Sequence, residues 1–155
     1  MQLRRAQPSE TRELKEWIAA HHYLASAPPG FVHLYEFTEG QQVIGGMILG
    51  RPSASTYNPD KILQLHRVFF VDNTRRNVES QGLAMMRRYV RVWLPHIRGL
   101  LSYSDPTVGH YGTIYEADMW CPLGLTDEAW GYGWNSRKDR RTQHISKKMR
   151  WFRTP

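Results

Sequence analysis

The chain has 155 residues, a formal net charge of +7 and one cysteine. This length suits one domain and no linker-like stretch divides it, so we expect a single domain over residues 1–155. One cysteine excludes an internal disulfide, and the absence of the roughly 20 consecutive apolar residues that a bilayer requires excludes a membrane-spanning helix. Residues 1–6 have no apolar stretch behind their arginines, so we expect no secretory signal and a cytoplasmic location.

The first half of the chain predicts one helix and four strands. Residues 2–7 are typical of a short strand, and Pro8-Ser9 supply a break and an N-cap for a helix that ends near His21. The prolines and glycine of residues 25–30 predict a loop. Apolar patterns then predict three strands, of which the first two form a hairpin through Glu39-Gly40: 31–37, 43–49 and 62–71.

The second half predicts a long helix over 76–93 that ends before Pro95, a strand beginning at 100–103, a second helix over 109–119, and short strands up to 150–152. A three-stranded antiparallel run therefore precedes a strand–helix–strand unit. This order resembles the GNAT fold of the acetyl-CoA-dependent N-acetyltransferases more than a doubly wound nucleotide-binding fold. We expect an α+β domain whose mixed central sheet is flanked by helices, with a V-shaped cleft between the central strands.

The junction between the strand ending at Val71 and the long helix resembles the segment with which the GNAT fold holds the pyrophosphate of acetyl-CoA. Backbone N–H groups at a helix N-terminus attract anions, and arginine and glycine reinforce such a site. The candidate coenzyme-binding residues are Arg75, Arg76, Ser80, Gly82 and Ala84. Glu79 departs from the pattern, which has glutamine or arginine there. The alternative is an ordinary amphipathic helix with its arginines in water.

Two candidate catalytic residues follow the next strand. Asp105 stands at the end of that strand, and Tyr115 lies on the helix after it, where such folds place ligands and catalytic groups. In the usual acetyltransferase mechanism a tyrosine on this helix protonates the thiolate of coenzyme A. The alternatives are that Asp105 is a turn or capping residue and that Tyr115 belongs to the core.

A third candidate site is His21-His22-Tyr23, which closes the first helix. A histidine there can simply interact with the C-terminal carbonyl groups of the helix. Alternatively, His22 acts as a general base, or His22 and Tyr23 together bind a transition metal such as iron. Cys121 is expected to be a small buried side chain and not a nucleophile.

Basic residues are concentrated at the C-terminus and around the long helix. The segment 137–155 includes Arg137, Lys138, Arg140, Arg141, Lys147 and Lys148, and the helix region includes Arg75, Arg76, Arg87, Arg88, Arg91 and Arg98. A basic face is often only solvated. Here Trp134, Trp151 and Phe152 are interleaved with the charges and suit stacking on bases, which favours nucleic acid as the partner.

Several short motifs together resemble the Mom family of phage DNA-modification proteins, in this order from residue 15 onward: His22-Tyr23, Gly50-Arg51-Pro52, Leu65-His66-Arg67, Tyr103-Ser104-Asp105-Pro106, Gly112-Thr113-Ile114-Tyr115 and Lys148-Met149-Arg150-Trp151. The resemblance implies a GNAT-derived enzyme that adds a carbamoylmethyl group to N6 of adenine in double-stranded DNA and so protects phage DNA from restriction. It implies acetyl-CoA as the carbon source and activity in the host cytoplasm. The catalytic residues would be His22, Tyr23, Arg67, Asp105 and Tyr115.

The chemistry implied by this resemblance is unusual for the fold. The amino group of adenine is already uncharged, and the new bond forms to the methyl carbon of the acetyl group, so the resemblance implies a redox-active iron held by His22 and Tyr23. Two other functions stay open: acyl transfer to an amine of a modified base, RNA or protein, and DNA binding without chemistry. The sequence leaves the oligomeric state open, a homodimer included.

Overall fold

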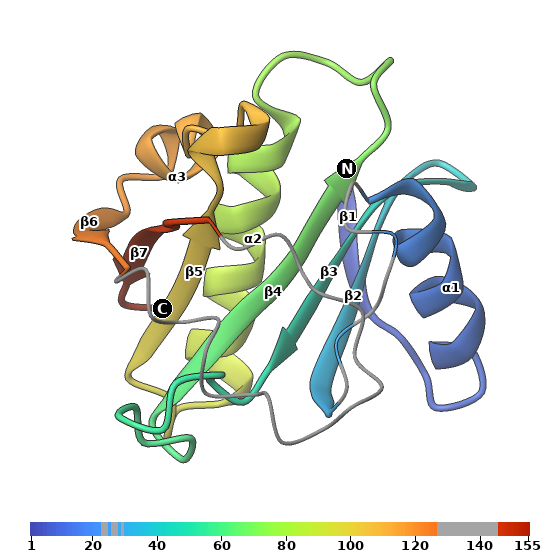
Figure 1. Cartoon of the computed structure of the whole chain (residues 1–155). Helices are drawn as coiled ribbons and strands as arrows, with labels where there is room; N and C mark the ends of the chain where they lie inside the picture. Colours follow the sequence, from blue (N-terminus) through green and yellow to red (C-terminus); the bar gives the residue numbers. More distant parts are fainter. Residues whose placement is uncertain (23–24, 26–27, 29, 127–145) are drawn as a thin grey trace, which may run out of the picture.

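The computed structural model describes residues 1–22, 25, 28, 30–126 and 146–155. Within these residues seven strands form one mixed sheet in the order β1-β2-β3-β4-β5-β7-β6 (Figure 1). The elements are β1 (Gln2–Arg5), α1 (Thr11–His21), β2 (Phe31–Glu39), β3 (Gln42–Gly50), β4 (Ile62–Phe70), α2 (Val78–Trp93), β5 (Gly99–Ser104), the 3-10 helix η1 (Pro106–Val108), α3 (Thr113–Ala117), β6 (Cys121–Leu125) and β7 (Met149–Arg153). The predicted α+β architecture is confirmed.

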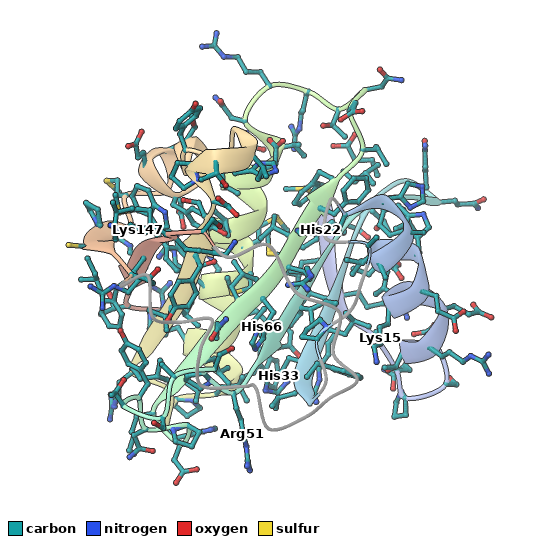
Figure 2. The ribbon with its side chains drawn as sticks, in the orientation of Figure 1. Lys15, His22, His33, Arg51, His66 and Lys147 are labelled. Atoms are coloured by element: carbon teal, nitrogen blue, oxygen red, sulfur yellow. The ribbon has the colours of Figure 1, made fainter. Side chains whose placement is uncertain are left out.

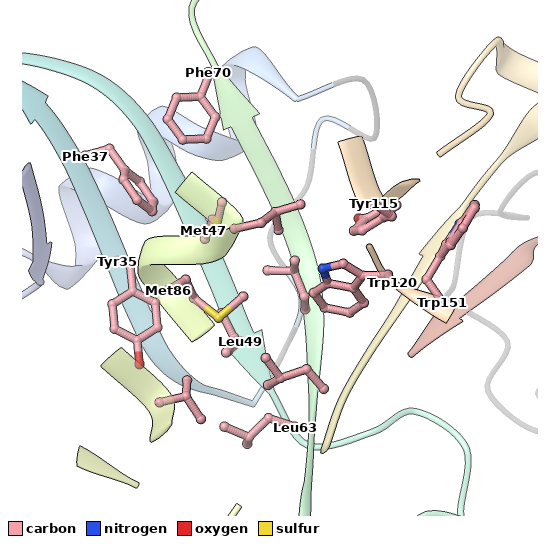
Figure 3. Close-up of a cluster of buried hydrophobic side chains, with 14 of the residues drawn as sticks. Tyr35, Phe37, Met47, Leu49, Leu63, Phe70, Met86, Tyr115, Trp120 and Trp151 are labelled. Carbon is pink, nitrogen blue, oxygen red and sulfur yellow. The ribbon is translucent and has the colours of Figure 1, made fainter. Parts of the chain in front are cut away.

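The helices cover the two faces of the sheet because side chains alternate along its strands. On β3, Met47 and Leu49 pack in the main core with Met86 of α2 (Figure 3), and Leu83 of α2 belongs to the same core. Ile48, between them, packs with α1 on the opposite face. None of the helices in the part of the chain that the structure describes is long and apolar enough to cross a membrane.

The central strands β4 and β5 pair for only part of their length. They are parallel, as the α2 crossover allows, and their paired residues are Ile62–Leu65 with Gly99–Ser102. Residues 67–70 of β4 pair with β3 but not with β5. The two strands therefore diverge after Leu65 and Ser102, and we call this point the fork. The divergence agrees with the predicted V shape.

Two local expectations are wrong. The predicted helix over 109–119 is shorter, because within that range only Thr113–Ala117 (α3) are helical: Gly109 and Gly112, with φ angles of +82° and +89°, end η1 and precede α3. A side chain at Gly112 would also collide with the Trp151 ring, 2.3 Å from an ideal Cβ. Cys121 is exposed, not buried, because it lies on the edge strand β6.

Candidate functional site

The fork carries a buried pair of hydroxyl groups. Ser102, the last β5 residue paired with β4, is 1% exposed and its hydroxyl donates to the carbonyl of Leu65 over 3.0 Å. The hydroxyl oxygen of Tyr115 lies 2.8 Å from Ser102 Oγ. With the single Ser102 proton on the Leu65 carbonyl, Tyr115 is the donor in this second bond. The Tyr115 hydroxyl is therefore directed to the point where the sheet opens.

Aromatic packing fixes the Tyr115 ring. Trp151 stacks on it at 5.6 Å between ring centroids, and Trp120 meets it edge-on at 5.2 Å (Figure 3). The Trp151 indole N–H donates to Ser104 Oγ over 2.8 Å. The prediction that Trp151 stacks on a nucleic-acid base is wrong for this structure, because its side chain is 3% exposed and belongs to the core. Tyr115 is itself a core residue, so its functional role stays a prediction.

Asp105 is the centre of a polar cluster at the end of β5. Its carboxylate is 2% exposed and accepts from the backbone N–H and hydroxyl of Thr107, from Ser146 Oγ, and from Lys148 Nζ at 2.5 Å. Burial by itself raises the pKa of Asp105, but the hydrogen bonds from Lys148, Ser146 and Thr107 hold it well below its usual value. Asp105 therefore remains ionised at neutral pH.

The basic candidates of the C-terminal segment 137–155 fall into three groups. The Lys148 ammonium binds Asp105, so its predicted contact with DNA phosphate is replaced by an internal ion pair. Lys147 is exposed, and its DNA contact stays a prediction. The other basic candidates of the C-terminal segment lie outside the described residues: Arg137, Lys138, Arg140 and Arg141. Tyr23 also lies outside the described residues.

The arginines of α2 also differ from one another. Arg87 forms a bidentate pair with the buried carboxylate of Asp118, with both N···O distances 2.7 Å, and so joins α2 to the end of α3. Trp120 donates to the same carboxylate. Arg87 is therefore structural and not a phosphate-binding side chain, whereas Arg88 and Arg91 on α2, and Arg98 between α2 and β5, are exposed.

His22 and Arg67, distant in sequence, act on each other electrostatically. His22 follows α1, and its backbone N–H caps the helix by donating to the Ile18 carbonyl over 2.9 Å. Burial, then the positive charges of Arg67 and His110, lower the pKa of His22 to about 4, so its imidazole is neutral at pH 7. The sequence did not single out His110. Its place beside Gly109 in the loop before α3 was the available signal.

Two of the sequence motifs meet on β4. His66 Nε2 lies 3.0 Å from the Arg51 carbonyl and Nδ1 lies 3.1 Å from Gln64 Nε2, an arrangement that fits a neutral ring donating from Nε2. Gln64 in turn accepts from the Ser53 backbone N–H. Figure 2 shows His66 at the middle of β4, Arg51 toward the strand's start, and His22 between β4 and α1. His66 therefore anchors the loop after β3.

The predicted coenzyme segment is open to solvent at the start of α2. Asn77, the N-cap, has a φ of +64° and gives no side-chain cap, so the first N–H groups of the helix lack that partner. Arg75 and Arg76 are exposed, and Arg75 Nε lies 3.4 Å from Glu39 Oε1. These features suit an anion site.

The remaining coenzyme candidates have local roles. Ser80 Oγ donates to the Asn77 carbonyl, and Ala84 is exposed on α2. Gly82 faces the core, where an ideal Cβ would lie 2.5 Å from the Phe70 ring. The close packing of α2 on β4 therefore accounts for this glycine without a ligand.

Iron does not fit the described part of the chain. No group of three or more His, Cys, Asp or Glu side chains there is arranged to hold a metal ion. The positive charge of Arg67 also acts on His22, which opposes a cation at that imidazole. Tyr23, the second predicted ligand, lies outside the described residues.

Comparisons with solved structures give the fold. A GNAT family acetyltransferase from Elizabethkingia anophelis with acetyl-CoA bound has a TM-score of 0.65 at 8% identity, over 99% of this chain and 97% of that chain. Ribosomal-protein-alanine N-acetyltransferase from Brucella melitensis has a TM-score of 0.66 at 10% identity, over the whole of both chains (100% each). A GNAT-like decarboxylase in complex with isobutyryl-CoA, GphF, has a TM-score of 0.67 at 13% identity, over 99% of each chain.

Sequence comparison gives the family. No curated protein sequence is significantly similar to this chain. Residues 5–154 match the Mom protein family, a span that includes the fork, the Asp105 cluster and the start of α2. The chain therefore belongs to the Mom protein family, and it has the GNAT fold.

Proposed function

We propose that this protein is an acetyl-CoA-dependent transferase that modifies N6 of adenine in DNA to the carbamoylmethyl form. The observation that carries the proposal is the fork, where Tyr115 and Ser102 present hydroxyl groups at the divergence of β4 and β5 in a chain of the Mom family. Among the solved neighbours, a GNAT-like decarboxylase that binds an acyl-CoA supports a reaction other than simple N-acetylation on this fold.

Acetyl-CoA would supply an activated two-carbon unit. The exposed Arg75 and Arg76 and the uncapped N–H groups of α2 would hold its pyrophosphate, since arginine and a helix N-terminus both favour a diphosphate. Glu79 in the first turn is unfavourable to an anion there, which makes the two arginines more important. The fork lies further back along β4 from that segment, at the point where β4 and β5 stop pairing.

At the fork, this chain's own groups would orient the acyl unit and control a proton. The Tyr115 hydroxyl has its proton directed at Ser102, and the Ser102 proton is held by the Leu65 carbonyl. Trp120 and Trp151 pack against the Tyr115 ring and would exclude water from that side of the pair. The Tyr115 hydroxyl, held in this way, can donate its proton to the departing thiolate of coenzyme A without a large movement.

The acceptor would be an adenine base. Its N6 is unreachable within a duplex, so the base must be flipped out at a cost of a few kcal/mol. Basic residues of the segment 137–155 other than Lys148 would offset that cost by contacting phosphates, and the neutral His22 and the cationic Arg67 would face the flipped base. Neutralising Arg140, Arg141 and Lys147 together should lower the slope of log affinity against log salt by about three units.

Mass spectrometry of nucleosides tests the proposal. DNA from cells that express the wild-type protein should contain carbamoylmethyladenine, and DNA from cells that express Tyr115→Phe should contain little or none. An acetylated nucleoside would assign the simpler acyl transfer instead. Unmodified DNA, together with tight salt-dependent DNA binding, would assign a binding module without chemistry.

A further inference from the structure

Lys148 binds a carboxylate that the family motif contains, although Lys148 lies 43 residues further along the chain. Its Nζ is 2.5 Å from Asp105 Oδ2 and 3.2 Å from Ser146 Oγ, and its side chain is 25% exposed. The Asp105 side chain is almost fully enclosed. An ion pair of this kind is costly to break from one side only, because the remaining charge stays buried without its partner.

The Asp105 cluster connects segments that build the fork. Asp105 ends β5, and its backbone carbonyl accepts from the His110 N–H over 3.1 Å, which shapes the loop that leads to α3 and Tyr115. Lys148 precedes β7, the strand that carries Trp151 against the Tyr115 ring. The backbone of Lys148 also exchanges hydrogen bonds with Thr126, so this residue is held on both sides.

We propose that Lys148 is a positioning residue, whose ammonium group fixes the Asp105 carboxylate and thereby the loop that places Tyr115 at the fork. This role rests on the proposed function as far as turnover is concerned. The ion pair itself is independent of it. Composition suggested that Lys148 binds DNA, but the structure assigns its charge to the interior of the site.

The other charged groups near Asp105 do not replace Lys148. On β7, Arg150 donates to backbone carbonyls of β6. In the loop before α3, His110 reaches Asp105 through its backbone N–H. Lys147 is exposed. Among the described residues, Lys148 is therefore the cation in hydrogen-bonding contact with this carboxylate.

The first test needs no activity. The denaturant midpoint of unfolding is measured between pH 5 and 8 for the wild type, Lys148→Met, Lys148→Arg and the control Lys61→Met, which changes an exposed lysine. Without the ammonium group only the hydrogen bonds from Ser146 and Thr107 oppose the effect of burial, so the pKa of Asp105 rises from its wild-type value and the deficit of Lys148→Met should be largest at pH 8 and shrink as the pH falls. Lys148→Arg should keep most of the stability, and Lys61→Met all of it.

Two results of this measurement would overturn the proposal: a Lys148→Met midpoint equal to that of the wild type, or a deficit that is the same at every pH. If Lys148→Met does not fold at pH 8, the double variant Asp105→Asn with Lys148→Met decides the question. It removes both charges together and should fold, because no unpaired buried charge remains. A double variant that also fails to fold contradicts the charge pairing.

The second test measures DNA modification and acetyl-CoA affinity with the same proteins. Lys148→Met should lose at least about tenfold in turnover at pH 8 while its affinity for acetyl-CoA stays within about threefold, and Lys148→Arg should recover most of the turnover. Wild-type turnover in Lys148→Met, or an arginine variant no better than methionine, would contradict the positioning role. If the wild type itself gives no product, the proposed function fails, but the pH-dependent stability still decides the role of Lys148.

Discussion

The start of α2 and the fork are the two ends of one candidate site, and they are built in opposite ways. At the start of α2 the arginines are exposed and the helix N–H groups have no side-chain cap. At the fork the hydroxyl and indole groups of Tyr115, Ser102 and Trp151 are all hydrogen-bonded within the protein.

This difference separates groups that can bind a ligand from groups that hold side chains in position. Exposed cations and unpaired N–H groups are available to a ligand and contribute little to stability. Buried, paired groups hold a geometry, and their loss is felt by the whole fold. Substitutions at the start of α2 should therefore change affinity, whereas substitutions at the fork should change stability first.

The largest expected effect comes from Trp151→Ala. Removing a buried tryptophan leaves a cavity beside Tyr115 and an unpaired Ser104 hydroxyl, so we expect a loss of about 3–5 kcal/mol in the free energy of unfolding. Urea titration measures it, with Trp93→Ala, an exposed tryptophan on α2, as the matched control. A small loss at Trp151 would mean that the fork is not a packed region, and the contrast between the two ends would disappear.

Protonation of His22, which lies between the two ends, should lower the free energy of unfolding by about 1–2 kcal/mol between pH 7 and pH 5. The pKa of His22 is lowered to about 4 from an ordinary value near 6.5, so protons bind the unfolded chain more tightly than the folded one. The resulting stability is complete above pH 6.5 and is lost as the pH falls from 6.5 toward 4. His22→Gln should reduce that acid loss in urea titrations at pH 7 and pH 5. An unchanged pH dependence would place His22 in water.

Tyr115→Phe should have a smaller effect on stability. It removes one hydroxyl, leaves the stacked ring in place, and should cost about 1 kcal/mol because Ser102 loses its donor. Ser102→Ala and the double variant complete a double-mutant cycle, in which the two losses should be less than additive. Additive losses would show that the two hydroxyl groups are independent. Under the proposed function, Tyr115→Phe should also abolish DNA modification.

The sequence predicted the fold well because alternating apolar residues and helical periodicity are local signals. It failed at 109–119, where the glycines adopt positive φ angles that composition does not specify. The candidate residues Asp105 and Tyr115 were found through motifs, but their partners were not. Ser102 and Ser104 alternate within an otherwise apolar strand, which was a usable signal for a buried polar face.

The contact between Lys148 and Asp105 had no such signal. A lysine in a basic segment is ordinarily solvated, and only the folded chain brings it to a carboxylate 43 residues away. Trp151 was misassigned for the same reason, since interleaved aromatic and basic residues are typical of both nucleic-acid surfaces and amphipathic strands such as β7. Long-range pairing, and not residue type, decides which role applies.

The smallest expected effect on stability, and the sharpest test of the open end, is the double substitution Arg75→Ala with Arg76→Ala. Both side chains are exposed, and the ion pair that Arg75 makes within the described part of the chain is a surface contact with Glu39, so the free energy of unfolding should change by less than about 0.5 kcal/mol. If they hold a diphosphate, calorimetry should show the Kd for acetyl-CoA rising at least about tenfold at low salt. The difference should narrow as added salt screens the charges. Arg88→Ala with Arg91→Ala, which removes the same charge from exposed positions further along α2, should leave the Kd nearly unchanged. Equal weakening by both pairs would indicate general attraction to a basic protein, and no weakening by either would remove the start of α2 from the coenzyme site.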